Sequence, residues 1–536
     1  MTFAFVGGLA GVSLWSAPPP IVAPWDTLIL LDGGYRITEG QAPSTDFSNP
    51  IGPLLYGLVA IGMRFQRVPS LAAVTYGSLI FLALAAPLAW FVARSRVPAM
   101  YAAAFTGFVA LVVVSVRPLG YSPSTTAYAM LYNRFGWVLY ATVLLAVLCR
   151  PRRQPTARGL VVQGAVLGVL LGLLFYCKFN FFVAAVGAAV IGFALSTTSR
   201  RVRFWIAAAG GFVAIAIAMR LAFNVRTGAY VADLGDATRA QGAQHRLHML
   251  TSSVADNLPV ALLVVVSLAA LFVVARRRGS AMSPVWRVSV AAVYVACSSV
   301  VVSSTNSQER SELPALVIVP MLLVAFLALG LPRWAGGGIR AHDSARIPLA
   351  LSAALAVLFV ATAGPIAGHD ASGIAHSAAL REYVAEPPQT QQFHSERLHD
   401  FVIPADSQWP TAYRTAHVVP EMINDGFALL VRHVGPGDTV VTMALTDPFS
   451  FALSLPSSRG GLLWWDLGFN FDESAHPGAD QVLGDTQWVM VPRIVAGQGC
   501  CEESVQVMLD LYGPYLAQHF TEAERTSDWI LLGRAK

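Results

Sequence analysis

The chain has 536 residues, of which 55% are hydrophobic and only 12% are charged, and its mean hydropathy is +0.57. A soluble domain usually carries about 25% charged residues, so this composition excludes an ordinary water-soluble enzyme and predicts that lipid covers much of the surface. The net charge of +5 comes almost entirely from arginine, and in a membrane protein it indicates basic cytoplasmic loops rather than nucleic-acid binding.

Apolar runs recur along the first two thirds of the chain. A membrane span needs about 20 mostly apolar residues, and the runs predict about eleven membrane-spanning helices. They cover Thr2–Ser16, Leu71–Val92, Met100–Val116, Gly136–Cys149, Leu160–Tyr176, Phe179–Leu195, Phe204–Phe223, Pro259–Ala275, Val288–Ser304, Leu313–Leu331 and Pro348–Gly364. The sequence therefore predicts a polytopic α-helical membrane domain over residues 1–367.

Basic residues mark alternate loops between these helices. The loops are Arg94-Ser95-Arg96, Arg150 to Arg153, Arg200 to Arg203, Arg276 to Arg278, and Arg333 to Arg346. All five fall on one side of the predicted membrane, and cationic loops face the cytoplasm. We therefore expect a bacterial inner-membrane protein with Met1 inside, and with the first loop (residues 17–70) and everything after Gly364 outside.

The first outward loop combines acidic residues with two short helical patterns. Asp26 follows a proline-rich segment, and Leu28, Leu31 and Tyr35 then recur at helical spacing, which predicts an amphipathic helix lying along the membrane surface. A second apolar stretch opens at Gly52-Pro53-Leu54. It is too short for a span, so we expect another interfacial helix.

This loop resembles the corresponding loop of the GT-C superfamily of membrane glycosyltransferases, which includes protein mannosyltransferases and aminoarabinose transferases. In that superfamily an acidic residue after the first span begins a pattern that runs through a glycine to a proline-leucine turn. Asp26 stands fourteen residues before Gly40, and the stretch from Asp46-Phe47 to Leu54 is similar to a DF…GPL variant. Thr27 replaces the second acid and Gly52 the first proline, so a two-carboxylate metal site does not follow from the resemblance.

The resemblance implies transfer of a sugar from a polyprenyl phosphate to an acceptor at the outer face. The acceptor needs a general base, or a metal that lowers its pKa, and an interfacial carboxylate serves either role. Asp26 is the candidate base, with Asp32 and Asp46 as alternative or supporting carboxylates. A divalent cation remains open as a cofactor, with Asp26 as its ligand. The alternative is that Asp26 only caps the interfacial helix.

The phosphate leaving group needs fixed cations or hydrogen-bond donors. Lys178 is the only lysine before the last residue and lies at an outward turn between two apolar spans. Asn133 and Arg134 precede the fourth span on the same side, and with Tyr35 they complete the candidate substrate-binding set. The alternatives are a lysine that snorkels to the interface and an arginine that binds ordinary lipid headgroups.

Polar residues return to soluble proportions in the final segment, residues 368–536. Strands are predicted at Thr439–Leu445, Gln487–Val491 and Trp529–Leu532, and helices at Glu421–Val434 and Glu503–Phe520, which together predict a small extracytoplasmic α/β domain. Three further features lie in outward segments, and we favour a structural interpretation for each. We expect the Trp464-Trp465 pair to belong to a core or interface, Cys500 and Cys501 to be small buried residues, and Asn306 to Glu312 to form a solvated turn.

The sequence thus predicts an inverting glycosyltransferase. Its partners would be a polyprenyl-phosphate-linked sugar, a glycan, lipid or protein acceptor, and membrane lipid, without nucleic acid. Two alternatives belong to other classes: a transporter or lipid flippase, and a non-catalytic scaffold of the same fold. Transporters place ionisable residues near the membrane midplane, whereas the polar residues here gather at the outward ends of the helices.

Overall fold

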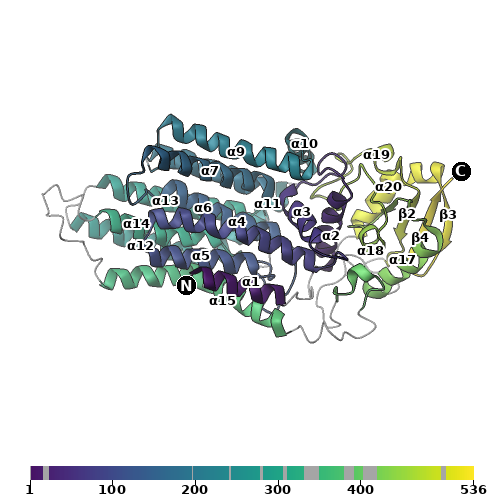
Figure 1. Cartoon of the computed structure of the whole chain (residues 1–536), viewed down its shortest axis with the longest axis horizontal. Coiled ribbons are helices and arrows are strands. Elements are labelled where there is room, and N and C mark those ends of the chain that lie inside the picture. The colour runs from purple at the N-terminus through teal and green to yellow at the C-terminus, as the bar shows by residue number, and fades with distance from the viewer. Residues whose placement is uncertain are drawn as a thin grey trace.

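The computed structural model describes residues 2–15, 23–195, 197–240, 243–277, 282–305, 311–330, 349–379, 392–402, 419–495 and 502–535. Long helices lie side by side in one body, the C-terminal domain lies at one end of that body, and α2 and α3 lie between the two (Figure 1). Most of the predicted Asn306–Glu312 turn (residues 306–310), the basic loop from Arg333 to Arg346, and Cys500-Cys501 fall outside the described residues.

The helical body is built from the N-terminal three quarters of the chain. Its helices are α1 (Thr2–Trp15), α2 (Pro24–Thr38), α3 (Pro53–Arg64), α4 (Ala72–Arg96), α5 (Ala99–Val114), α6 (Leu131–Leu148), α7 (Ala157–Cys177), α8 (Phe179–Ala194), α9 (Val202–Phe223), α10 (Thr227–Ala240), α11 (Ala243–Asp256), α12 (Leu258–Arg277), α13 (Met282–Ser303), η1 (Pro314–Val317), α14 (Ile318–Gly330) and α15 (Leu349–Ala379).

Each of the eleven predicted spans coincides with a helix, so the protein is a multi-pass helical membrane protein. By length and composition, six described helices qualify as spans: α4, α6, α7, α9, and most of α13 and α15. The number rises to seven if α11 and α12, bent by 61° at their junction, form one broken span. The other four predicted spans are shorter apolar helices, and α15 continues past the predicted domain boundary at residue 367.

Helix α2 differs from the predicted surface helix. It starts at Pro24, where the fixed φ of proline suits the first helical turn. Nearly all of its residues are buried, including Asp32 and Arg36 on the face that would otherwise meet water. The C-terminal domain covers that face, because Arg36 donates a 2.6 Å hydrogen bond to the carbonyl of Ser458. The predicted helix is therefore present, but protein and not water covers its polar face, and its position along the membrane surface stays a prediction.

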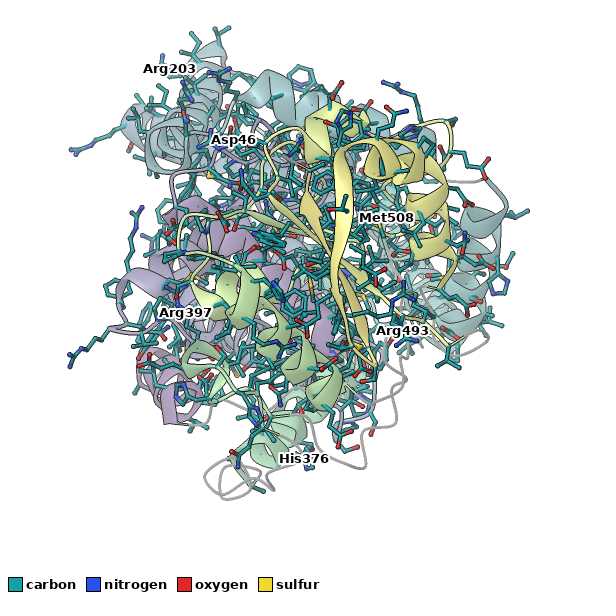
Figure 2. All side chains as sticks on the ribbon, turned by 90° about the vertical axis from the view of Figure 1, so that its right-hand side faces the viewer. Asp46, Arg203, His376, Arg397, Arg493 and Met508 are labelled. Carbon is teal, nitrogen blue, oxygen red and sulfur yellow. The ribbon has the colours of Figure 1, made fainter. Side chains whose placement is uncertain are left out.

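The C-terminal domain contains a four-stranded sheet in the order β1-β2-β4-β3, with β1 (Val440–Thr442), β2 (Trp488–Pro492), β3 (Phe520–Arg525) and β4 (Trp529–Arg534). β1 and β2 are parallel, and the other two pairs are antiparallel. Helices α17 (Val419–His433) and α20 (Glu502–His519) confirm the predicted α/β character, with the short helices α18 (Phe449–Leu453) and α19 (Ala479–Leu483) beside them. Figure 2 views the molecule from this end.

The first loop and the C-terminal domain are joined by backbone hydrogen bonds. Ser48 donates to the carbonyl of Gly461 at 3.0 Å and accepts from the N–H of Leu463 at 3.0 Å. Gly460 donates in turn to the carbonyl of Asp46 at 2.6 Å. A bridge between Ser48 and Leu462 results, so the residues of the DF…GPL stretch fix the position of the domain on the helical body.

Candidate functional site

Asp26 lies in the first turn of α2 and is mostly buried. The N-cap is Ala23, which makes no side-chain cap, so the alternative that Asp26 caps the helix is not supported. The positive end of the helix favours a carboxylate at this position. Among the described residues, the Asp26 carboxylate accepts a hydrogen bond only from its own backbone N–H, which leaves it able to take a proton.

Asp466 approaches Asp26 from the C-terminal domain. Burial, together with the neighbouring charge of Asp466, raises the pKa of the Asp26 carboxyl from 3.8 to about 7. Burial also raises the pKa of Asp466 to about 6. A carboxyl group that titrates near the working pH is suited to general base catalysis.

Lys178 stands at the junction of α7 and α8 on the same side of the helical body. Its Nζ donates to Asn133 Oδ1 at 2.7 Å and lies 4.6 Å from the centre of the Tyr132 ring. Burial lowers the pKa of the Lys178 ammonium to about 7. A nearby anion would favour the charged form again, so this lysine is suited to bind a phosphate.

Tyr132 connects the two groups. Both Asp26 and Asp466 lie close enough to its hydroxyl to act on it electrostatically, while the ring faces Lys178. Asn133 adds a hydrogen-bond donor, because its Nδ2 is buried and has no acceptor among the described residues. We call Asp26, Asp466, Tyr132, Asn133 and Lys178 the Asp26 cluster.

Close backbone packing brings these elements together. Gly52 has a φ of +123°, and a Cβ there would lie 2.6 Å from the carbonyl oxygen of Tyr176 and 2.7 Å from that of Cys177. Only glycine fits at this position. The start of α3 is thereby held against the end of α7, next to Lys178.

Asp32 belongs to a buried ion pair instead of the cluster. Arg36 Nε contacts its Oδ2 at 2.8 Å, and both side chains are almost fully buried. Burial raises the pKa of Asp32 to about 7, against the opposing effect of Arg36. Because Arg36 also donates a hydrogen bond to Ser458 of the C-terminal domain, the ion pair helps to hold that domain against the helical body.

Asp46 ties together its own loop. Its carboxylate accepts from the N–H of Ala42 at 2.7 Å and lies 3.3 Å from Arg459. No described contact joins it to Asp26. This arrangement gives Asp46 a structural function at the border with the C-terminal domain. Asp46 is labelled in Figure 2.

Arg134 points into a separate buried network. It lies 2.7 Å from Asp370 of α15, which also accepts from Arg117 at 3.0 Å, and Arg117 pairs with Glu312 at 2.8 Å. Arg134 is therefore paired inside the protein and is not brought together with Lys178 and Asn133.

Tyr35 also anchors the C-terminal domain. Its hydroxyl donates to the carbonyl of Leu455 at 3.1 Å, and the guanidinium of Arg397 lies 4.9 Å from its ring centre. Of the tryptophan pair, Trp465 is buried against Phe471 and Tyr512, as expected for a core residue.

Among the described residues, no group of three or more His, Cys, Asp and Glu side chains is arranged to hold a metal ion. The Asp26 cluster offers two carboxylates. Mg²⁺ is often bound by one or two carboxylates together with substrate phosphate, so these two residues would be the ligands of a cation that arrives with its substrate.

Asp466 was not among the residues predicted from the sequence. The available signal was an isolated acid directly after Trp464-Trp465 in an apolar stretch. Tyr56 was missed as well. Its hydroxyl is buried without an acceptor among the described residues, and its charge environment includes Asp26 and Tyr132.

Comparisons with known proteins give a structural likeness but no sequence match. No protein-family model matches the chain, and no curated protein matches it. A similar solved structure is the crystal structure of ArnT from Cupriavidus metallidurans bound to undecaprenyl phosphate. The match covers 99% of this chain and 98% of that chain, with 13% identity and a TM-score of 0.45.

Proposed function

We propose that this protein is a glycosyltransferase that moves a sugar from a polyprenyl phosphate to an acceptor at the outer face of the cytoplasmic membrane. The observation that carries the proposal is the Asp26 cluster, in which a carboxylate pair and a lysine meet at the predicted outward ends of the helices. The motif resemblance of the first loop centres on the same Asp26.

The reaction needs a base for the acceptor. Asp26 removes the proton of the acceptor hydroxyl as its oxygen attacks the anomeric carbon, and the bond between that carbon and the phosphate oxygen breaks. Attack from the face opposite the phosphate inverts the anomeric configuration. Asp466 adjusts the pKa of Asp26 through its negative charge.

The departing phosphate gains negative charge and needs no proton. The Lys178 ammonium and the free Nδ2 donor of Asn133 supply charge and a hydrogen bond at that position. Tyr132 keeps Lys178 in place through its ring. The shape of the site therefore separates the base from the phosphate-binding groups, as an in-line displacement requires.

The test is sugar transfer in membranes that contain the wild type, Asp26→Asn, Asp466→Asn or Lys178→Gln, supplied with radiolabelled polyprenyl-phosphate sugars. Loss of a general base usually lowers the rate by about 100-fold to 10,000-fold, so we expect at least a hundredfold loss for Asp26→Asn. Asp480→Asn, an exposed acid of the same C-terminal domain, is the matched control and keeps its activity.

Three outcomes separate the possibilities. Equal transfer by wild type and Asp26→Asn would remove Asp26 from the mechanism. Activity that disappears in EDTA and returns with Mg²⁺ would assign the two carboxylates to a cation instead of base catalysis. No transfer from any donor, with folded protein in every sample, would reject the proposed class in favour of a transporter or a scaffold.

A further inference from the structure

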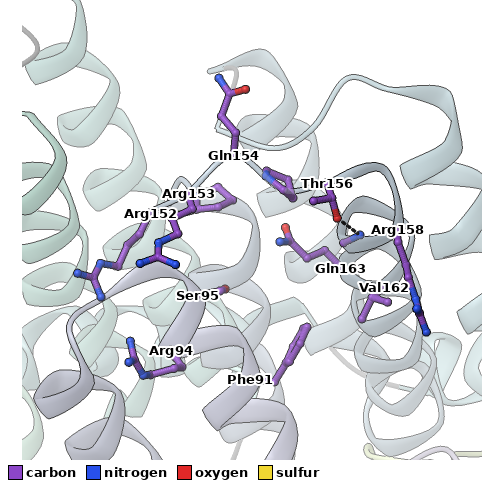
Figure 3. A pocket seen from close by; sticks show the side chains of 13 residues that line it. Phe91, Arg94, Ser95, Arg152, Arg153, Gln154, Thr156, Arg158, Val162 and Gln163 are labelled. Atoms are coloured by element: carbon purple, nitrogen blue, oxygen red, sulfur yellow. Dashed lines mark hydrogen bonds between the residues drawn. The ribbon is translucent and has the colours of Figure 1, made fainter.

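A large cavity lies between α4, α7 and the loop that precedes α7, at the end of the body away from the C-terminal domain (Figures 1 and 3). Its volume is about 1030 Å³. Arg94, Arg152 and Arg153 gather on one side of it, and Arg158 lies on the opposite side. The cavity is far from the Asp26 cluster, and the proposed reaction does not use it.

The lining of this cavity carries positive charge without nearby negative charge to balance it. No Asp or Glu is among the residues that line it, and within the described part of the chain its four arginines form no ion pair. A second cavity of about 330 Å³ shares Arg153 with the first and adds Arg150. Burial and the charge of Arg287 lower the pKa of Arg150, as expected where cations crowd together.

The orientation of a membrane protein explains why arginines lie on this side, but not why they surround a cavity. Basic loops direct insertion by their number and their distance from the spans. Four guanidinium groups around one cavity repel each other unless an anion lies between them. The position of these arginines around a cavity therefore indicates an anionic ligand, in addition to their effect on membrane orientation.

The surroundings of the cavity indicate what kind of anion this is. Phe91 and Val162 also line it, and each side chain is 40% exposed on a membrane helix. A phospholipid fits this arrangement. Its phosphate would contact the arginines at the helix ends, and its acyl chains would contact the exposed apolar side chains beside them. Basic pockets between membrane helices on the cytoplasmic side bind anionic headgroups in this way.

We propose that this arginine cavity binds the phosphate headgroup of an anionic phospholipid of the cytoplasmic leaflet, with an acyl chain against Phe91 and Val162. Arginine favours such a ligand because its planar guanidinium donates two parallel hydrogen bonds to a phosphate. The lipid joins the end of α4 to the start of α7 and thereby stabilises their packing.

The test uses the full-length protein purified in a neutral detergent. Binding is measured by native mass spectrometry and by the thermal unfolding midpoint during titration with phosphatidylglycerol, with phosphatidylcholine of the same acyl chains, and with inorganic phosphate. We expect binding of phosphatidylglycerol only. Equal binding of phosphatidylcholine, or saturation by inorganic phosphate at the same concentration, would overturn the proposal.

Matched variants locate the site. Arg94→Gln/Arg152→Gln/Arg153→Gln removes three charges from the cavity, and Arg200→Gln/Arg203→Gln/Arg276→Gln removes three exposed charges that line neither cavity. Each cation near an anionic surface contributes roughly a fivefold factor, so the first variant should bind phosphatidylglycerol about a hundredfold more weakly. An equal loss in both variants would show a non-specific surface effect and reject the site.

A single substitution covers the case in which the triple variant fails to fold. Arg153→Gln alters the one arginine that both cavities share, and we expect binding several-fold weaker than in the wild type with an unchanged unfolding midpoint in lipid-free detergent. Unchanged affinity in this variant would contradict the assignment.

Discussion

Two residues with similar chemistry, Asp26 and Asp466, come to the same site from opposite ends of the chain. The first is a lone acid at the start of α2 and the second follows a tryptophan pair in the C-terminal domain. Each carries a raised pKa for the same main reason, burial, and the charge of Asp466 adds to the effect on Asp26. The ionisation of Asp26 therefore depends on that of Asp466, and the pH dependence of sugar transfer should show this coupling.

We predict that kcat/KM of the wild type rises with pH and reaches half of its plateau near pH 7, because Asp26 acts as a base only when ionised. In Asp466→Asn the negative neighbour is absent. The pKa of Asp26 then falls, and the acidic limb moves to lower pH. The measurement is a pH profile of sugar transfer, and a limb that stays in place or moves upward in the variant would contradict the coupling.

The Asp32–Arg36 pair gives a prediction about stability. Arg36→Met leaves the Asp32 carboxyl buried without its cation, and breaking a buried pair in this way usually costs about 3–5 kcal/mol. We expect a large drop in the thermal unfolding midpoint in detergent. The double variant Asp32→Leu/Arg36→Met removes both charges and should recover most of the loss, and a double variant as unstable as the single one would exclude this explanation.

Single residues show what the sequence can and cannot reveal. Asp26 and Lys178 could be singled out because each is a rare charge beside apolar helices. The partner of Arg134 lies 236 residues further along the chain, so the arginine resembled a free phosphate ligand until the fold placed Asp370 beside it. Asp466 lies even further from the rest of the Asp26 cluster in sequence, and no local pattern connects it to α2.

Secondary-structure elements were predicted more completely than sites. Apolar runs and basic loops located the helices, because burial in lipid depends on length and composition. Strand β3 was missed, since Phe520–Arg525 is mostly polar and exposed and continues directly from α20. The cover over the polar face of helix α2 could not be predicted, because it comes from residues near the other end of the chain.

The junction of α3 with α7 depends on one glycine. Gly52→Ala places a Cβ against two backbone carbonyl oxygens, which cannot move aside as a side chain could. We expect loss of stability and of sugar transfer, because the end of α7 carries Lys178. Gly40→Ala is the control: Gly40 also has a positive φ, of +83°, but its Cβ would meet nothing within 4 Å.

The control variant should lose only about 1–2 kcal/mol, the usual penalty for a left-handed backbone outside glycine. Thermal unfolding and transfer rates measure both effects. If Gly40→Ala and Gly52→Ala were equally impaired, the left-handed backbone alone would explain why glycine is needed at position 52. The close contact with α7 would then not be the reason.

At the scale of the whole molecule, the site requires both the helical body and the C-terminal domain. The bridge between Ser48 and Leu462 holds the two parts in register. Partners across a strand pair lie about 5 Å apart, which a disulfide can span. The Asp26 cluster is complete in this arrangement, so we expect the proposed sugar transfer to proceed without movement of the domain away from the helical body.

We therefore predict that Ser48→Cys/Leu462→Cys, oxidised to a disulfide, retains transfer activity within about threefold of the reduced form. The double variant in reductant and each single variant serve as controls, and activity is measured with the same labelled donors. A loss of activity that reductant reverses would show that the domain must move during the reaction.

The buried contacts of Asp370 also bear on how the protein is made. Asp370 is on α15, the last membrane helix to leave the ribosome, whereas its partners Arg117 and Arg134 enter the bilayer much earlier. During synthesis Arg117 can pair first with Glu312, whereas Arg134 lacks its counter-ion until α15 arrives. A chain terminated before Asp370 would keep the charge of Arg134 uncompensated in an apolar setting. The complete network therefore forms only in a chain that extends through α15.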